Sequence, residues 1–394
     1  MRGRRVWAAK LAGIAGAWLG ASVAAPPPGP DVLPGPAPEA GFAQALEVRT
    51  FVFPRDHGPH PEYRQEWWYV TGNLDSTSGE RFGFELTFFR FALQPPAAAP
   101  DAAPAAAAAG APLPGASAWR THQIYMAHFA ITDAARQHFQ FTQKLSREAL
   151  GLAGARTAPL RVWIDDWSLG AADAAATAGQ AAPWTLKAAE PGYAVELTLA
   201  PERAPVLNGE DGLSRKSDTR ADASYYYSMP RLSVRGRLLR GGEALDVSGL
   251  AWLDREWGSG GLGANEAGWD WFALQLSDGS SLMFYALRDK SGGRDVHSAG
   301  TWIPAGGAAR ELVSADVDID VGAQWRNSAG ERYPARWHIH VPKLALELDV
   351  RPVLADQELK TRPRYWEGAV DVRGEREGER VGGRGYVELV GYAR

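Results

Sequence analysis

Apolar residues recur at every second position in many short runs of this chain of 394 residues. In the run "RFGFELTFFRFAL", Phe82, Phe84, Leu86 and Phe88 fall on one side of an extended chain. A period of two matches a β-strand, in which successive side chains point to opposite faces. Gly, Pro, Asp or Asn separates most of the runs. Helical patterns are scarce, with residues 143–152 as the best candidate, so the sequence predicts an all-β barrel or sandwich.

Residues 1–25 have the three parts of a secretory signal peptide. A positive start, "MRGRR", precedes the mostly apolar "VWAAKLAGIAGAWLG" and the small residues "ASVAA". We expect cleavage near Ala24 or Ala25 and a periplasmic or secreted mature protein. A membrane anchor is the weaker alternative, because Lys10 interrupts an apolar run shorter than the roughly 18 residues that span a bilayer. Residues 26–42 follow as a Pro-rich linker.

Composition excludes several classes of protein. The chain has 42 Lys and Arg against 46 Asp and Glu, a net charge of −4, so it offers no basic surplus for nucleic acid. Cysteine is absent, which excludes disulfides, thiol catalysis and zinc–thiolate sites. No G-x-S-x-G motif, P-loop or dinucleotide fingerprint occurs, so serine-hydrolase and nucleotide-binding functions have no motif to support them. The sequence indicates no cofactor.

A faint internal repeat predicts two related β domains. Residues 66–90 begin with a Trp-rich strand, cross a Ser/Gly turn and return as an aromatic strand. Residues 269–289 repeat this pattern through "SDGS", with Arg288 near the end. Two copies of one hairpin imply two domains, which we place at residues 43–240 and 241–394.

Two further stretches bear on the domain organisation. Residues 94–116 are rich in Ala and Pro, and their prolines prevent one continuous helix. We expect this stretch to be a poorly ordered loop of the first domain that is dispensable for folding. Gly241 and Gly242 suit a hairpin turn close to the expected boundary.

Adjacent tryptophans open the first hairpin copy, in "EWWYVTGNL". In a strand, Trp67 and Tyr69 face one way, while Glu66, Trp68 and Val70 face the other. One indole then plugs the floor of a barrel, and the other covers its outside or meets the second domain. Two large residues that point apart suit a strand packed on both faces.

Several stretches resemble the family that joins AttH-type secreted proteins to carotenoid 1,2-hydratases. They are "FPRDHGPHPEYRQEWWYVTGNL", "AHFAITD", "YYYSMPRL", "GLAWLDREWGS", "GWDWFALQLSDG" and the terminal "YWEGAVDVRG" with "GRGYVELVGY". The resemblance implies two lipocalin-like β-barrel or sandwich domains in tandem, with a hydrophobic ligand site in or between them. It also implies links with ABC-transport components for many members. Its enzymes hydrate isolated double bonds or guide the cyclisation of polyenes.

The stretch "LDREWG" holds the strongest candidates for catalysis. In an extended segment Asp254 and Glu256 share one face, and Arg255 points to the other. Two carboxyls beside tryptophans acquire separate pKa values, one group staying protonated in an apolar wall and the other ionised. A protonated carboxyl delivers a proton to an olefin, and water then meets the cation. With Tyr285, these two acids are our candidate catalytic residues.

A structural role is the alternative for both acids, because ion-pair networks imitate functional sites. In that interpretation they pair with Arg255, Arg288 or Arg231 and fix the strand. The hydratase branch of the family carries a histidine within the matching stretch, where this chain has none. This difference counts against a carotenoid as the substrate.

Aromatic residues of the two hairpins and of "YYYSMPRL" are candidates for the wall of a ligand site. If the repeat makes the two domains face each other, these side chains converge on one mostly apolar cleft with a few polar groups. Barrel packing is the alternative role for the tyrosines. Our candidate ligand-binding residues are Trp68, Tyr227, Trp257, Trp269, Trp271 and Arg288.

Two histidine pairs are candidate metal ligands. His57 and His60 stand in "DHGPH" ahead of Glu66, and His338 and His340 lie two apart on one strand. Neither spacing matches a familiar metal motif. Turn capping for the first pair and a surface strand for the second are the preferred interpretations, so we predict no metal site.

The sequence leaves three functions open. One is an interaction protein whose cleft receives a partner, and the other two concern a small molecule. The first is an exported lipocalin-like protein that binds a hydrophobic small molecule or lipid and serves an ABC transporter or envelope process. The second is an enzyme, a hydratase or isomerase for an unsaturated lipid or terpenoid, with a hydro-lyase of carotenoid 1,2-hydratase type as its specific form. Fold resemblance alone does not decide between them.

Overall fold

The computed structural model describes residues 41–96, 119–172 and 182–393. The expected signal peptide, most of the Pro-rich linker and most of the Ala/Pro-rich loop lie outside these residues. Those three expectations therefore stay predictions.

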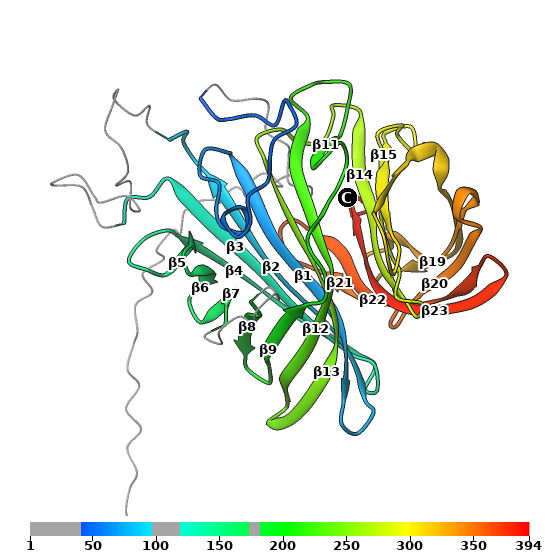
Figure 1. Ribbon diagram of the computed structural model, residues 1–394. Coiled ribbons are helices and arrows are strands. Elements are labelled where there is room, and N and C mark those ends of the chain that lie inside the picture. Colours follow the sequence, from blue (N-terminus) through cyan, green and yellow to red (C-terminus); the bar gives the residue numbers. More distant parts are fainter. Residues whose placement is uncertain (1–40, 97–118, 173–181, 394) are drawn as a thin grey trace, which may run out of the picture.

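Antiparallel strands make up the first sheet, which runs from β1 to β13 along the chain (Figure 1). The spatial order is β4-β3-β2-β1-β13-β12-β9-β8-β7-β6-β5, and β10 and β11 also pair with β12. The strands are β1 (Gln65–Ser76), β2 (Arg81–Ala92), β3 (Gln123–Asp133), β4 (His138–Arg147), β5 (Ala153–Thr157), β6 (Leu160–Ile164), β7 (Trp167–Ala171), β8 (Trp184–Glu190), β9 (Tyr193–Pro201), β10 (Val206–Leu207), β11 (Leu213–Arg215), β12 (Ala223–Arg240) and β13 (Glu243–Gly258).

A second antiparallel sheet takes the remaining strands, in the order β17-β16-β15-β14-β23-β22-β20-β19-β18, with β21 beside β22. Figure 1 shows it curling into a barrel-like shape next to the first sheet. Its strands are β14 (Glu266–Leu276), β15 (Ser281–Asp289), β16 (Ala299–Ile303), β17 (Arg310–Val313), β18 (Asp318–Arg326), β19 (Arg332–Val341), β20 (Leu346–Pro352), β21 (Glu358–Leu359), β22 (Tyr365–Arg376) and β23 (Glu379–Val390).

Helix in the described part of the chain is limited to three short 3₁₀ turns, η1 (Arg55–His57), η2 (Ser314–Asp316) and η3 (Pro342–Leu344). The all-β prediction is confirmed. The short helix expected at residues 143–152 is wrong, because β4 extends to Arg147 and pairs along β3. None of the helices in the described ranges has the length and apolar character needed to cross a bilayer.

Three separate clusters of buried apolar side chains explain the two-sheet architecture. The first sheet folds around a core that includes Trp68, Trp167 and Trp257. The second sheet encloses another core, with Trp337 and Trp366. A third cluster joins the sheets and takes residues from both, among them Tyr69, Tyr226, Trp252, Trp271 and Tyr285.

The hairpin repeat that the sequence indicated is present as β1–β2 and β14–β15. The two turns are alike, since the Gly79 N–H donates to Ser76 O and the Gly279 N–H donates to Leu276 O. Both glycines have positive φ angles, of 83° and 85°, a conformation that disfavours other residues. Each hairpin's first strand also pairs with the last strand of its own sheet, β13 or β23.

The change from one sheet to the other lies later in the chain than residue 240. The strand β13 stands between β1 and β12, so the first sheet continues to Gly258. Gly241 and Gly242 form the turn of the β12–β13 hairpin, and a hairpin turn keeps both of its strands in one sheet. The second sheet begins at Glu266.

Polar contacts lock the two sheets together. The Asn73 Nδ2 group donates to Gly385 O at 3.1 Å, and Gln275 Nε2 donates to Pro230 O at 2.8 Å. A Cβ atom added at Gly83 would lie 2.6 Å from Ala369 Cβ, so this glycine permits the close approach of β2 and β22. The two sheets thus form one packed unit with a shared boundary.

Candidate functional site

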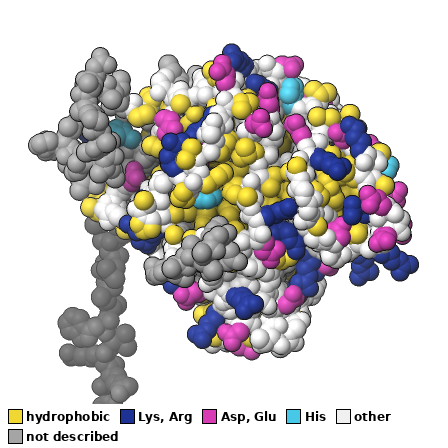
Figure 2. Space-filling model, viewed as in Figure 1, with side chains coloured by type: hydrophobic (Ala, Val, Ile, Leu, Met, Phe, Trp, Pro, Cys, Tyr) yellow, Lys and Arg dark blue, Asp and Glu magenta, His cyan; other side chains and the backbone are white. Residues whose placement is uncertain are grey.

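A pocket with a cavity volume of about 160 Å³ lies at the boundary between the sheets. Figure 2 shows hydrophobic side chains gathered over the middle of this face, where the two sheets meet. The residues that line the pocket are Gln65, Trp67, Tyr69, Phe89, Phe91, Lys216, Ala223, Ser224, Tyr226, Asp254, Glu256, Gly258, Gly260, Gly261, Leu262, Trp269, Trp271, Tyr285, Leu287 and Glu388.

Strand register brings the polar groups of the first sheet to this pocket. Tyr69 on β1 lies directly opposite Asp254 on β13, and Trp67 lies opposite Glu256. Tyr226 on β12 is the other neighbour of Glu256. Because directly opposed residues point to the same face of a sheet, these side chains share the pocket side.

Asp254 carries a buried carboxyl without a cationic partner. Its oxygens accept hydrogen bonds from the Tyr226 hydroxyl, from Ser228 Oγ at 2.6 Å and from Trp252 Nε1 at 2.6 Å. Burial raises the pKa of Asp254 from 3.8 to about 7, although these three hydrogen bonds oppose the shift. The group is therefore a mixture of acid and anion close to neutral pH.

Glu256, two residues on, has a charged partner. It accepts a hydrogen bond from the Ser224 hydroxyl and forms an ion pair with Lys216 Nζ at 3.3 Å. The same ammonium lies 4.2 Å from the centre of the Tyr285 ring and donates to Ser214 Oγ at 2.9 Å. The pocket thus holds an acid without a counter-ion beside an acid with one.

The second sheet adds a third acid to the pocket. Glu388 on β23 lies opposite Trp271 on β14, and its Oε2 atom accepts a hydrogen bond from Trp269 Nε1 at 2.6 Å. Burial, together with nearby carboxylates, raises the pKa of Glu388 from 4.5 to about 8, although the Trp269 hydrogen bond opposes the shift. Trp271 Nε1 in turn donates to the Tyr226 hydroxyl at 3.1 Å, which links the two sheets inside the pocket.

The structure brings five of the nine predicted site residues to the pocket. They are Asp254, Glu256, Tyr285, Trp269 and Trp271. The alternative for Asp254 and Glu256 is wrong in the partners that it names, because neither carboxyl group bonds to Arg255, Arg288 or Arg231.

Those three arginines each have another partner. Arg255 binds Glu66, Arg231 binds Glu202 at 3.2 Å, and Arg288 binds Asp270 at 3.0 Å. The charge of each guanidinium is therefore matched away from the pocket.

Four predicted ligand-binding residues lie elsewhere. Trp68, Tyr227 and Trp257 are buried in the core of the first sheet, on the face opposite the pocket. Arg288 also does not line the pocket. For the first three, the prediction chose the wrong face of the strand. The residue one position before each of them lines the pocket, because adjacent residues in a strand point to opposite faces.

Sequence reasoning missed several pocket residues, chiefly Trp67, Tyr69, Tyr226, Lys216 and Glu388. For the first three a signal existed. The alternation that places Asp254 and Glu256 together also selects one face of each neighbouring strand, once the register is known. For Lys216 and Glu388 the sequence held no signal, because only the packing of the two sheets brings them to the pocket.

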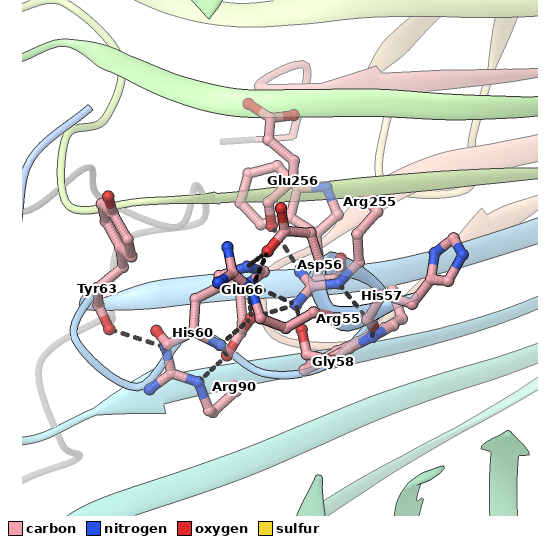
Figure 3. A network of polar contacts seen from close by, with 12 residues as sticks. Arg55, Asp56, His57, Gly58, His60, Tyr63, Glu66, Arg90, Arg255 and Glu256 are labelled. Atoms are coloured by element: carbon pink, nitrogen blue, oxygen red, sulfur yellow. Dashed lines mark hydrogen bonds and ion pairs between the residues drawn. The ribbon is translucent and has the colours of Figure 1, made fainter. Parts of the chain in front are cut away.

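A second polar cluster lies behind β13, on the core side. Figure 3 shows Glu66 between Arg90 and Arg255, with His60 and Asp56 beside them. His60 stacks on Trp257 with 3.8 Å between ring centres. These contacts hold the loop before β1 against the barrel, which is a structural role for the His57–His60 turn.

The histidine pairs do not form a metal centre. Among the described residues, no group of three or more His, Cys, Asp or Glu side chains is arranged to hold a metal ion. His338 is exposed on β19, and His340 lies 3.6 Å from Asp318.

Comparison with known proteins identifies the family. The sequence profile of the AttH-like family matches residues 44–392. The chain belongs to the AttH-like family. The crystal structure of an AttH protein from Nitrosomonas europaea is 34% identical, with a TM-score of 0.75, and the match covers 89% of this chain and 100% of that one. The two-domain lipocalin-like fold expected for the family is thereby confirmed.

Two other relatives have names that state a reaction. Kievitone hydratase from Nectria haematococca shares the fold at a TM-score of 0.63 and 15% identity, covering 89% of this chain and 95% of its own. The dehydratase asqC from Emericella nidulans is 24% identical over 232 residues, which are 52% of this chain and 60% of that protein. This AttH-like chain thus matches less than two thirds of the dehydratase. Addition and removal of water are the two directions of hydro-lyase chemistry.

Proposed function

We propose that this AttH-like protein is a hydro-lyase that adds water to, or removes it from, a hydrophobic small molecule held between the two sheets. The observation that carries the proposal is Asp254, an acid with a pKa of about 7 inside an aromatic pocket. A general acid works best when its pKa lies near the working pH. The names of the hydratase and dehydratase relatives support the same reaction class.

Three groups of the pocket supply the steps of a hydration. The proton of Asp254 passes, directly or through the Tyr226 hydroxyl, to one carbon of a double bond. The oxygen of a water molecule bonds to the other carbon, and one of its protons goes to the Glu256 carboxylate. Proton exchange between the two acids and solvent then restores the starting state. The reverse sequence is a dehydration.

Aromatic faces provide the rest of the catalytic environment. Trp67, Trp269 and Trp271 line the pocket, and the faces of indole rings stabilise a developing positive charge. Their apolar surface also favours the binding of a hydrophobic substrate. A terpenoid with an isolated double bond, the type of substrate implied by the carotenoid 1,2-hydratase resemblance, fits this environment.

Binding without turnover is the second candidate, and the largely aromatic lining favours it as much as it favours an enzyme. In that case the pocket holds a hydrophobic small molecule or lipid for an envelope or transport process. The association with ABC-transport components and the periplasmic or secreted location remain predictions. The two candidates differ in what they require of Asp254, since an apolar ligand gains nothing from a buried acid.

The test is incubation of the purified protein with a panel of hydrophobic alkenes, tertiary alcohols and β-hydroxy ketones in ¹⁸O-labelled water. Mass spectrometry measures the gain, loss or exchange of water by each compound. We expect turnover in the wild-type protein and in the control Asp320→Asn, an exposed acid on β18 that does not line the pocket. Asp254→Asn should lose at least about 100-fold in rate, because general acids contribute that much.

Asp254→Asn should keep ligand binding, measured by quenching of tryptophan fluorescence, and its melting temperature should stay near the wild-type value. An asparagine matches the size and neutrality of the protonated acid. Absence of turnover in the wild type across the panel, combined with tight binding, would favour the second candidate. Full activity in Asp254→Asn would refute the assigned role of this acid.

A further inference from the structure

Three glutamates meet at the boundary between the sheets, and the mechanism above uses none of them. Glu85 on β2 and Glu367 on β22 are completely buried, and Glu388 lies beside Glu367 on the neighbouring strand β23. Each of the three carboxyl groups accepts a hydrogen bond from a tyrosine hydroxyl or from a tryptophan N–H. The Tyr69 hydroxyl donates to Glu367 Oε1 at 2.6 Å, and the Tyr365 hydroxyl donates to Glu85 Oε1 at 3.0 Å.

The other oxygen of each inner glutamate has no partner. Glu85 Oε2 and Glu367 Oε2 are both buried without a hydrogen bond. A carboxylate in such a place is costly, because a buried charge needs a partner. Burial raises the pKa of Glu85 to about 7 and that of Glu367 well above its usual value. These two groups thus add no negative charge behind Glu388 in acidic solution, whereas Glu85 is a mixture of acid and anion near neutral pH.

Glu388 differs from the other two because it reaches the pocket. Its side chain is only half-buried, and it lines the cavity. The neighbouring acids Glu85, Asp254 and Glu256 each raise the pKa of Glu388. Glu388 is therefore a neutral carboxylic acid that faces a ligand site.

The indole of Trp269 fixes where the proton of that acid lies. Trp269 Nε1 donates to Glu388 Oε2, so Oε2 is the hydrogen-bond acceptor of the carboxyl group. The acidic hydrogen is then carried on Oε1. This leaves an O–H donor on the second-sheet wall of the pocket, while Asp254 stands on the first-sheet wall.

We propose that the Glu388 O–H donates a hydrogen bond to a carbonyl oxygen of the ligand, so that the pocket selects hydrophobic compounds in which the reacting carbons are conjugated to a carbonyl group. A neutral acid in an apolar site is suited to an oxygen on which negative charge develops. The inference rests on the proposed hydro-lyase function. It replaces the isolated double bond named above by α,β-unsaturated carbonyl compounds and their β-hydroxy counterparts.

The hydration step balances with these groups. Water forms a C–O bond at the β-carbon and gives one proton to Glu256. The electrons of the C=C bond move toward the carbonyl oxygen, which the Glu388 O–H stabilises without transferring its proton. Asp254 then protonates the α-carbon, and the carbonyl group is restored. Glu388 acts throughout as a hydrogen-bond donor.

Two probes of nearly equal size test the carbonyl preference. They are 2-acetylnaphthalene, which has a C=O acceptor, and 2-isopropenylnaphthalene, which has C=CH₂ in its place. We expect the wild-type protein to bind the ketone about 3- to 10-fold more tightly, the usual value of one hydrogen bond. Quenching of tryptophan fluorescence measures both affinities.

Glu388→Leu should remove the preference, and Glu388→Gln should keep it. Glutamine can accept the Trp269 N–H with its carbonyl and donate its NH₂ group to the ligand. Asp320→Asn is the control variant and should behave as the wild type. Equal affinities of the two probes for the wild type, or loss of the preference in Glu388→Gln, would overturn the proposal, and neither result depends on the folding of Glu388→Leu.

Turnover separates this inference from the proposed function. Hydration of an isolated alkene, undiminished in Glu388→Leu, would leave the hydro-lyase function standing and refute the carbonyl preference. A Glu388-dependent preference for the ketone without turnover of any β-hydroxy ketone would support the carbonyl site and count against the hydro-lyase.

Discussion

At the scale of single residues, adjacent side chains of β13 point to opposite faces of the sheet and have different roles. Asp254 and Glu256 point to the pocket, while Arg255 between them is fully buried on the core side. Its guanidinium lies 3.8 Å from the Trp68 ring centre and is paired with Glu66. The alternation of the strand keeps the positive charge away from Asp254, so the acid retains its raised pKa.

The Glu66–Arg255 pair should contribute strongly to folding, unlike ion pairs at the surface. Removal of one partner from a buried pair leaves an uncompensated charge, so Glu66→Gln should lower the free energy of unfolding by about 3–5 kcal/mol. The control is Glu196→Gln, which breaks the exposed pair with Lys187 and should cost less than about 1 kcal/mol. Denaturant unfolding measures both, and equal losses would contradict this account of the core cluster.

The raised pKa of Glu388 predicts how its replacement alters stability with pH. An acid whose pKa rises on folding stabilises the protein fully below its unfolded pKa, and this contribution is lost as the pH rises through the folded value of about 8. Glu388→Gln has no such dependence. The free energy of unfolding of Glu388→Gln minus that of the wild type should therefore increase by about 1–3 kcal/mol from about pH 5 to about pH 9.

Parallel denaturant titrations across this range provide the measurement. A constant difference between variant and wild type would show that Glu388 is ionised at the same pH in the folded and unfolded protein. That result would remove the neutral donor from the pocket.

At the scale of elements, the sequence was sufficient to predict the strands. It was not sufficient to predict which face of each strand lines the pocket. The two-residue period identified β1, β2, β14 and β15 and their repeated hairpin. It also placed Asp254 with Glu256. It did not give the register of β12 against β13, and a choice between Tyr226 and Tyr227 depends on that register alone. A shift of one residue exchanges the pocket face for the core face.

The two hairpin turns offer a matched test of the repeat. Gly79 and Gly279 have positive φ angles, so Gly→Ala at either position should cost about 1–2 kcal/mol of stability. The added methyl of Gly79→Ala meets nothing within 4 Å, so backbone strain alone accounts for its loss. At Gly279 the new Cβ lies 3.1 Å from Ala305, which adds to the cost.

Gly306→Ala serves as the control, because that glycine has open space around it and no positive φ angle. Its melting temperature should match the wild type. A loss in the control as large as in the two turn variants would show that strain at the turns is not the cause.

At the scale of the whole molecule, the site exists only because two sheets meet. The first sheet supplies Asp254 and Glu256, and the second supplies Trp269, Trp271 and Glu388. Residues up to 323 positions apart, counted from Gln65 to Glu388, thus face one cavity. The repeated hairpin indicated two domains, but no sequence pattern states which strands of each domain face the other.

The location of the pocket also separates this protein from a barrel that binds its ligand inside. Large aromatic side chains fill the cores of both sheets, among them Trp68 and Trp257 in the first and Trp337 and Trp366 in the second. The space between the sheets, which holds the aromatic pocket, is therefore the ligand site of both proposals. Both proposals depend on this location of the ligand.

A crystal structure of the protein with bound 2-acetylnaphthalene tests this claim most directly. We predict electron density for the naphthyl ring between the sheets, against Trp67 and Trp271, within contact distance of Asp254 on one wall and with the ketone oxygen beside Glu388 on the other. Density for the ligand inside either barrel core, or on the outer surface of one sheet away from Asp254, would contradict it.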